Sequence, residues 1–165
     1  MVTDTTTPSA WAPPGARQRR DILDRSKTVA IVGASANTSR PSYFVATYLL
    51  SSSTDYEVWF VNPRETEILG RPVFASLADL PDVPDIVDVF RRAEDLPSVA
   101  AEAIAIGAKV LWAQLGLHSE EAAALATAAG LDVVMNRCLK IEHARFHGGL
   151  HLGGFDTGVI SSKRR

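Results

Sequence analysis

The chain has 165 residues, nearly half of them apolar, and a formal net charge of -2. This length fits a single domain with a sizeable core, and the slightly negative, interspersed charge predicts no general attraction to nucleic acid or to a membrane surface. The single cysteine, Cys138, excludes an internal disulfide framework and zinc sites built on cysteine pairs, and no apolar run approaches the ~18 residues of a membrane span.

Both ends of the chain differ in composition from its middle. Residues 1–16 are rich in Thr, Pro and Ala, lack the pattern of a signal peptide and predict a disordered arm, in which Trp11 could still dock. Residues 17–143 alternate apolar and helical patterns and predict the folded domain. Residues 144–165 contain Gly and His and predict an extended tail. We expect a cytoplasmic protein, because a lone cysteine fits a reducing compartment.

The first long elements predict a strand, a loop and a helix, after a short helix at 17–26. Residues 28–32 are uniformly apolar after Thr28, as in a strand buried on both faces of a parallel sheet, and Gly33 ends them. Pro41 suits the first turn of a helix over 41–50, with Ser39 or Arg40 near its cap. The loop is therefore expected to present free backbone N–H groups at a helix N-terminus, which favours anion binding.

The remaining patterns alternate between strands and helices in the same way. Such alternation predicts an α/β fold in one domain, a Rossmann-like, doubly wound parallel sheet with helices on both faces. The expected elements are a strand at 56–61, a polar loop or single turn at 64–70, a short edge strand at 72–74, a short helix at 76–81, a strand at 85–90, a helix from Asp95 to Gly107, a strand at 109–113, a helix at 119–129 and a strand at 132–135.

Ligands of doubly wound folds lie outside the carboxyl ends of the strands. A dinucleotide site would have Gly-x-Gly-x-x-Gly after the first strand and an acidic residue at the end of the second. Here the loop has one glycine, Gly33, and the second strand ends in Asn62 and Pro63. The Gly-Lys-Ser/Thr of an ATP-binding loop is absent as well, so the pattern disfavours NAD and ATP.

A series of short motifs carries a resemblance to a known family. The chain resembles the small stand-alone CoA-binding proteins, which are similar to the CoA-binding domain of the succinyl-CoA synthetase alpha subunit. The resemblance runs from about Asp21 to His143, in order and without a large gap. The motifs that carry it are Val-Gly-Ala-Ser at 32–35, Arg-Pro-Ser-Tyr at 40–43, Val-Asn-Pro at 61–63, the run at 84–92, Gly-Ala-Lys-Val at 107–110, Trp-Ala-Gln-Leu-Gly at 112–116 and Val-Met-Asn-Arg-Cys at 134–138.

The resemblance implies nucleotide binding, with coenzyme A or a small acyl-CoA across the carboxyl edge of the sheet. In that case the first loop would hold the pyrophosphate through backbone N–H groups, hydroxyls and Arg40, and the second strand end would border the adenosine. The fourth and fifth strand ends would line the nucleotide and pantetheine. The expected site residues are Gly33, Ala34, Ser35, Arg40, Pro41, Ser42, Asn62, Pro63, Phe90, Arg91, Gln114 and Gly116.

No catalytic or metal-binding set is predicted. Asp85 and Asp88 are three apart on one strand and point to opposite faces, so they do not form an acid–base pair. His143, His147 and His151 recur every four residues, but the glycines at 148 and 149 interrupt the helix that would align them as metal ligands. Several residues also have purely structural interpretations, among them Asn62 as a strand end.

The function predicted from these patterns is a non-catalytic CoA-binding module for sensing or carriage. The alternative is an enzyme that uses NAD(P) or an acyl-CoA and completes its chemistry with Cys138, the C-terminal tail or another subunit. Cys138 is either an inert small side chain or a thiol within reach of the thiol of CoA. A third interpretation is an oligomeric scaffold with a vestigial pocket. A homo-oligomer or an unidentified protein partner is expected, with no nucleic acid and no membrane.

Overall fold

In the computed structural model, which describes residues 11–51 and 54–147, seven strands form one sheet in the order β3-β4-β2-β1-β5-β6-β7. All neighbouring strands pair in parallel except β3 with β4. The strands are β1 (Thr28–Val32), β2 (Glu57–Val61), β3 (Glu67–Ile68), β4 (Arg71–Phe74), β5 (Ile86–Val89), β6 (Val110–Ala113) and β7 (Asp132–Val134).

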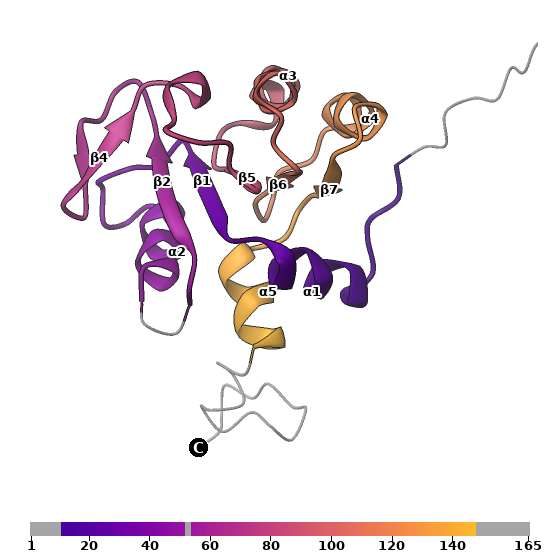
Figure 1. Cartoon of the computed structure of the whole chain (residues 1–165), viewed down its shortest axis with the longest axis horizontal. Helices are drawn as coiled ribbons and strands as arrows, with labels where there is room; N and C mark the ends of the chain where they lie inside the picture. Colours follow the sequence, from indigo (N-terminus) through magenta and orange to yellow (C-terminus); the bar gives the residue numbers. More distant parts are fainter. Residues whose placement is uncertain (1–10, 52–53, 148–165) are drawn as a thin grey trace, which may run out of the picture.

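Helices cover both faces of this sheet (Figure 1). The helices α3 and α4 lie on one face, and α1, α2 and α5 lie on the other. The order confirms the Rossmann-like, doubly wound fold, and it reverses between the neighbours β1 and β5. The helices are α1 (Ala16–Arg25), α2 (Pro41–Leu49), α3 (Leu96–Ile106), α4 (Glu120–Ala128) and α5 (Leu139–Phe146), with 3₁₀ turns η1 (Leu77–Asp79) and η2 (Ala93–Asp95).

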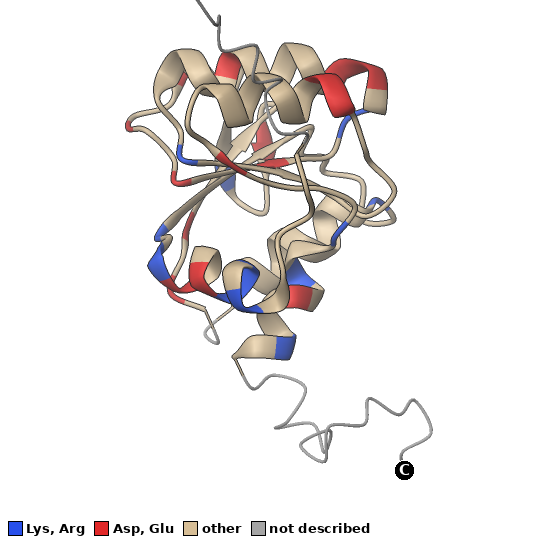
Figure 2. Cartoon of the chain, turned by 90° about the vertical axis from the view of Figure 1, so that its right-hand side faces the viewer, with Lys and Arg blue, Asp and Glu red and all other residues tan. Residues whose placement is uncertain are grey.

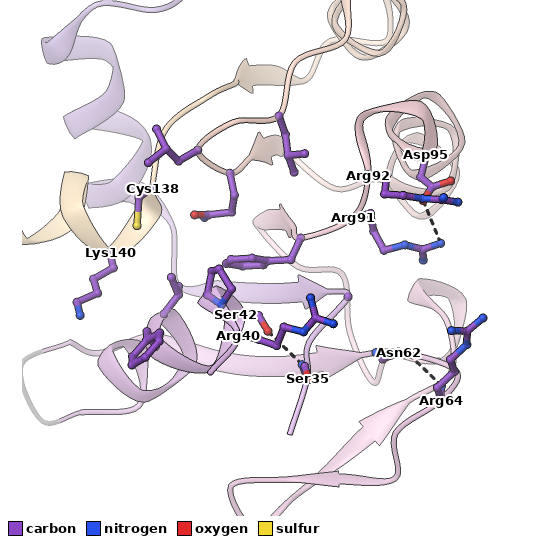
Figure 3. A pocket seen from close by; sticks show the side chains of 18 of the residues that line it. Ser35, Arg40, Ser42, Asn62, Arg64, Arg91, Arg92, Asp95, Cys138 and Lys140 are labelled. Atoms are coloured by element: carbon purple, nitrogen blue, oxygen red, sulfur yellow. Dashed lines mark hydrogen bonds and ion pairs between the residues drawn. The ribbon is translucent and has the colours of Figure 1, made fainter. Parts of the chain in front are cut away.

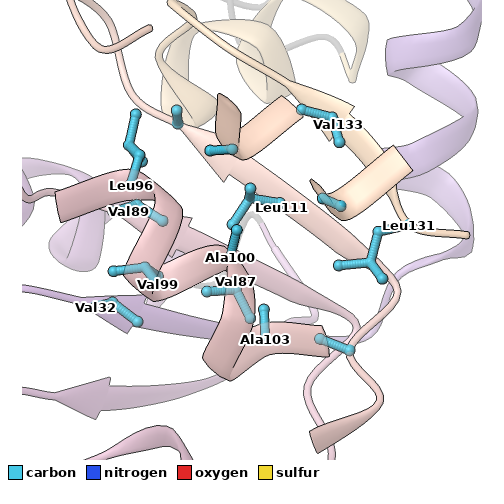
Figure 4. Packing of buried hydrophobic residues seen from close by; sticks show 14 of the residues in the cluster. Val32, Val87, Val89, Leu96, Val99, Ala100, Ala103, Leu111, Leu131 and Val133 are labelled. Atoms are coloured by element: carbon cyan, nitrogen blue, oxygen red, sulfur yellow. The ribbon is translucent and has the colours of Figure 1, made fainter. Parts of the chain in front are cut away.

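The uniformly apolar sequence of β1 follows from its place in the middle of the sheet. Val29, Ala30 and Ile31 are fully buried, because alternate side chains of the strand enter the two cores on opposite faces. One core lies under α3 and α4, where Ala100 and Ala103 let α3 approach the sheet closely (Figure 4). Burial on both faces fixes the register of the strand and so fixes where the loop after Val32 begins.

Two elements differ from the sequence-based expectation. The segment expected as a polar loop or a turn contains β3, which forms an antiparallel hairpin with β4 through Leu69 and Gly70, both at positive φ (50° and 74°). The strand expected at the sheet edge, β4, therefore lies inside it, and β3 is the edge. Two consecutive positive-φ residues define the tight hairpin turn that matches strand twist, but a leucine in the first position gives no recognisable signal.

The helix α5 is the second difference, because no helix was expected over these residues. It is held against α1 by a buried ion pair, in which Arg19 Nε lies 2.6 Å from Glu142 Oε1. The tail beyond residue 147 lies outside the described residues, as do residues 1–10 of the expected arm. Trp11 is described, and its indole N–H donates to the carbonyl oxygen of Val133 on β7 (3.0 Å).

The charged side chains divide unevenly between the two helical layers. The helices α3 and α4 carry Glu but no Lys or Arg, whereas α1 and α5 carry both signs (Figure 2). Among the helices of the described residues, none has the length and hydropathy needed to cross a bilayer.

Candidate functional site

A cleft of about 1130 Å³ lies at the carboxyl ends of the parallel strands. It is built from the loop after β1, the first turn of α2, the segments that follow β2, β5 and β6, and the first turn of α5 (Figure 3). The lining residues are Gly33, Ser35, Arg40, Pro41, Ser42, Phe44, Val45, Asn62, Pro63, Arg64, Phe90, Arg91, Arg92, Asp95, Gln114, Leu115, Leu117, Cys138, Lys140 and Ile141.

The expected site residues therefore meet in one place, with two exceptions. Ala34 is buried in the core beneath the loop and does not line the cleft. Gly116 also lies outside the lining, and its backbone N–H donates to Asn136 Oδ1 (2.7 Å). Ala34 and Gly116 were predicted as site residues from their positions in the sequence motifs. A motif alone does not tell which residues of a turn face the cleft.

Gly33 lets the chain leave β1 between the ends of β2 and β5, the two strands that flank β1. Its backbone N–H donates to the carbonyl oxygen of Val61 (2.9 Å), and its φ is +86°. A Cβ at this position would lie 2.4 Å from the carbonyl oxygen of Phe90. The residue must therefore be glycine both for its conformation and for the close approach of the segment after β5.

The loop from Ser35 to Arg40 is held together by its own side chains. The backbone N–H of Ser35 donates to Ser42 Oγ (3.1 Å), and that of Asn37 donates to Ser35 Oγ (3.0 Å). The backbone N–H of Ala36 donates to the carboxylate of Glu65 (2.9 Å). These N–H groups, expected to be free, are thus already paired, and one of them already binds an anionic group.

The end of α2 nearest the cleft keeps the features of an anion site. Arg40 is the N-cap residue and Pro41 occupies the first turn, as expected. The first N–H groups of a helix have no partner within the helix, and the helix dipole places partial positive charge there. Arg40 and Arg64 are both exposed, and neither has an ion-pair partner among the described residues.

The segment after β5 brings two further cations to the same end. Arg91 Nη2 lies 3.5 Å from Asp95 Oδ2, and Arg92 Nε lies 3.7 Å from the same oxygen. Asp95 is the single acidic side chain among the described lining residues, against the cations of Arg40, Arg64, Arg91, Arg92 and Lys140. The cleft therefore has a net positive lining, although the chain as a whole is slightly negative.

Asn62 acts as a structural residue at the end of β2. Its side-chain nitrogen donates to the carbonyl oxygen of Ala34 (2.8 Å), and its oxygen accepts from the backbone N–H of Arg64 (2.9 Å). Both ends of the amide thus hold the two loops that form the cleft. This geometry fits the structural interpretation of Asn62, and it places Arg64, which the sequence did not single out, at the cleft.

The sequence also gave no reason to select Asp88, which lies behind the cleft. Asp88 is fully buried, its Oδ1 accepts from Gln114 Nε2 (2.5 Å), and its Oδ2 has no partner among the described residues. Burial raises the pKa of Asp88 to about 8, although the hydrogen bond from Gln114 opposes this shift. Because the amide nitrogen of Gln114 is bound to Asp88, its oxygen remains as the acceptor that Gln114 offers to a ligand.

Cys138 and Lys140 lie at the opposite end of the cleft from Arg64 and Arg92 (Figure 3). Cys138 is the N-cap residue of α5 and is partly exposed. Arg137, next to Cys138 in the chain, forms an ion pair with Glu142 (3.6 Å). Lys140 lies with its ammonium group 5.9 Å from the ring centroid of Tyr48.

Two of the three regularly spaced histidines lie on α5, and the third, His151, is outside the described residues. The rings of His143 and His147 stack at 4.3 Å. His143 Nδ1 hydrogen-bonds the hydroxyl of Tyr48 (2.8 Å), and His147 Nε2 lies 2.8 Å from Asp24. Burial lowers the pKa of His143 to about 4, helped by His147 and opposed by Asp24. Among the described residues no group of three potential metal ligands occurs.

Comparison with known proteins gives a consistent result. A family model described as a CoA binding domain matches residues 27–144. The uncharacterized protein YneT of Bacillus subtilis (strain 168) is 40% identical over 131 residues, which make up 79% of this chain and 96% of that protein. A hypothetical protein from Pyrococcus horikoshii OT3 superposes with a TM-score of 0.77 at 38% identity, over 87% of this chain and 99% of that chain.

A structure from Thermus thermophilus superposes with a TM-score of 0.75 at 36% identity, over 81% of this chain and 99% of that chain. The match to the family model includes every segment that lines the cleft. The resemblance found in the sequence is thereby confirmed, and the chain belongs to the family of CoA-binding domain proteins.

Proposed function

We propose that this protein binds coenzyme A or an acyl-CoA in the cleft at the carboxyl edge of its sheet, as a binding module for sensing or carriage. The observation that carries the proposal is the concentration of basic side chains from three separate segments at one end of a single cleft. Arg40 precedes α2, Arg64 follows β2, and Arg91 follows β5. A ligand with several phosphate groups would place them between these residues and the N-terminus of α2.

The other parts of the cleft suit the rest of a CoA molecule. Phe90 follows β5, next to the end of β6 that Gln114 follows, and offers an aromatic surface. The acceptor oxygen of Gln114 is suited to the amide N–H groups of pantetheine, which is a chain of alternating amide and apolar segments. A nicotinamide dinucleotide would instead need an acidic residue at the end of β2 for its ribose, where this chain has Asn62.

A binding role is favoured over a reaction because most polar groups of the lining, apart from Asp95, Cys138 and Lys140, are of the kind that hold a ligand. Hydroxyls, an amide and guanidinium groups bind phosphates and amides, while proton transfer needs a titratable group close to the substrate. Asp88 is separated from the cleft by Gln114, and His143 is bound to Tyr48. The functional state we propose is therefore the complex itself, from which the thioester or the free thiol is presented to a partner.

Replacing two of the cleft cations tests this placement of the ligand. In an Arg40→Gln, Arg64→Gln double variant we expect CoA to bind about 10- to 30-fold more weakly, since two charge-assisted hydrogen bonds to phosphate are lost. The affinity of the variant should also depend less steeply on salt. Both side chains are exposed, so the fold should not change.

The matched control is an Arg17→Gln, Arg71→Gln double variant. It removes the same net charge from two exposed arginines outside the cleft. The measurement is titration calorimetry with CoA at two salt concentrations. Equal losses of affinity in the two double variants would show that CoA responds to overall charge and not to the cleft, and the proposed site would be wrong.

A further inference from the structure

The cleft away from Arg64 and Arg92 is lined by large apolar side chains that are exposed. Phe44 is 54% exposed, Leu115 65% and Ile141 45%. They come from α2, from the segment after β6 and from α5. The other exposed large apolar residues of the described chain, Leu69, Val83 and Leu125, lie outside the cleft. Exposed apolar side chains that gather in one cleft indicate a binding surface, whereas scattered ones carry no information.

Contacts between neighbouring residues bring the segments that carry these three side chains together. Lys140 packs over Tyr48, which lies one helical turn after Phe44, and so brings the first turn of α5, with Ile141, beside α2. The segment after β7 is fixed to the end of β6, because the indole of Trp112 donates to the carbonyl oxygen of Arg137 (2.9 Å). Leu115 is the second residue after β6.

The cleft thus has Arg64 and Arg92 at one end, and Phe44, Leu115 and Ile141, with Lys140 beside them, toward the other. A CoA molecule is built the same way, with its phosphates at one end and its thiol at the other. If the phosphates lie at the basic end, the thiol and any acyl group attached to it point to the apolar end, where Cys138 also lies. Free CoA ends in a polarisable thiol and would leave Phe44, Leu115 and Ile141 largely exposed.

We propose that the physiological ligand is a CoA thioester with an apolar acyl chain longer than acetyl, and that this chain lies against Phe44, Leu115 and Ile141. The proposal rests on the proposed function, because the CoA portion anchors the chain. The apolar surface and the basic surface belong to the same cleft. A ligand held at the basic end is therefore the molecule most directly placed to cover the apolar surface. An acyl chain reaches this surface as an extension of the ligand that the basic end holds.

The test is a calorimetric series with CoA and with acetyl-, butyryl-, hexanoyl- and octanoyl-CoA. A fully buried CH₂ strengthens binding about fourfold, and one that remains half exposed about twofold. We therefore expect hexanoyl-CoA to bind at least about tenfold more tightly than acetyl-CoA. Equal affinities for all thioesters, with CoA itself bound, would overturn the acyl proposal and leave the proposed function in place; no binding of any CoA species would overturn both.

A variant series shows whether the chain lies on this surface. Phe44→Gln with Leu115→Gln should abolish the gain in affinity with chain length, so that octanoyl-CoA and acetyl-CoA bind equally well, whatever the affinity for free CoA; both side chains are exposed, so the fold should not change. Leu125→Gln, on the exposed face of α4, is the matched control and should keep the full gain. A gain that survives in the double variant would place the acyl chain elsewhere or show that the apolar surface serves a protein partner, and would overturn the proposal.

Discussion

Gly33→Ala is expected to lower the free energy of unfolding by about 3 kcal/mol or more. Two causes add. A φ of +86° is unfavourable for any residue with a side chain, and the new Cβ would lie 2.4 Å from the carbonyl oxygen of Phe90. That oxygen belongs to backbone at the end of a central strand, so it cannot move aside without disturbing the pairing of β5 with β1.

Gly130→Ala is the control that separates the two causes. Gly130 has a similar φ, +92°, but a Cβ there would meet no atom within 4 Å. It should therefore cost only the conformational term, about 1 kcal/mol. The measurement is denaturant unfolding of both variants beside the wild type. If the two variants lose the same stability, the close approach of the segments after β1 and β5 does not shape the cleft as described.

Asp88→Asn is expected to stabilise the protein at pH 8 and to leave its stability nearly unchanged near pH 4. The pKa of Asp88 is raised from 3.8 to about 8, chiefly by burial. Between these values the folded state holds a proton that the unfolded state has released, so the stability of the wild type falls as the pH rises, by up to about 1.4 kcal/mol per pH unit. Asparagine keeps the acceptor for Gln114 and carries no charge at any pH.

His143 titrates in the same range but is present in both proteins. The pKa of His143 is lowered to about 4, so below its ordinary value of 6.5 the unfolded state binds the additional proton and the stability of each protein rises with pH. In the wild type this slope opposes that of Asp88 up to about pH 6.5, and it cancels in the difference between wild type and variant. We expect the variant to gain at least about 2 kcal/mol over the wild type at pH 8.

Unfolding free energies at pH 4, 6.5 and 8 check this expectation. Asp21→Asn, on the exposed surface of α1, is the control for replacing an aspartate by asparagine outside the core. A constant difference between wild type and Asp88→Asn across the range would mean that the Asp88 carboxyl does not change its proton affinity on folding. The interpretation of Asp88 as a neutral, buried support for Gln114 would then be wrong.

The sequence predicted the parts of the fold that depend on burial and on the proline and glycine residues that begin or end helices and strands. The uniformly apolar run of β1, the proline at the start of α2 and the glycine after α3 each have one physical meaning, and each element was found within a residue or two of its expected bounds. The helix α5 was missed because it is short and its stability depends on Glu142 pairing with Arg19, 123 residues earlier in the chain. No local pattern reports such a contact.

The candidate site was predictable to the level of the strand ends, because a parallel sheet brings those ends together whatever their spacing in sequence. The lining residues that lie farther from the strand ends were not predictable. Arg64 is placed by the amide of Asn62, and Ile141 is placed by the packing of α5 beside α2. The hydrogen bonds from the loop N–H groups to Ser42 and Glu65 could not be predicted from the sequence either, because they depend on side-chain positions that only the folded chain defines.

The most direct measurement of the central claim is calorimetric titration of the purified, ligand-stripped protein with CoA, with NAD and ATP titrated in parallel at one salt concentration and with reductant present. We predict saturable binding of CoA to one site per chain and no saturable binding of NAD or ATP. Binding of NAD alone, or of none of the three, would contradict it, because the basic end of the cleft would then not be a CoA site.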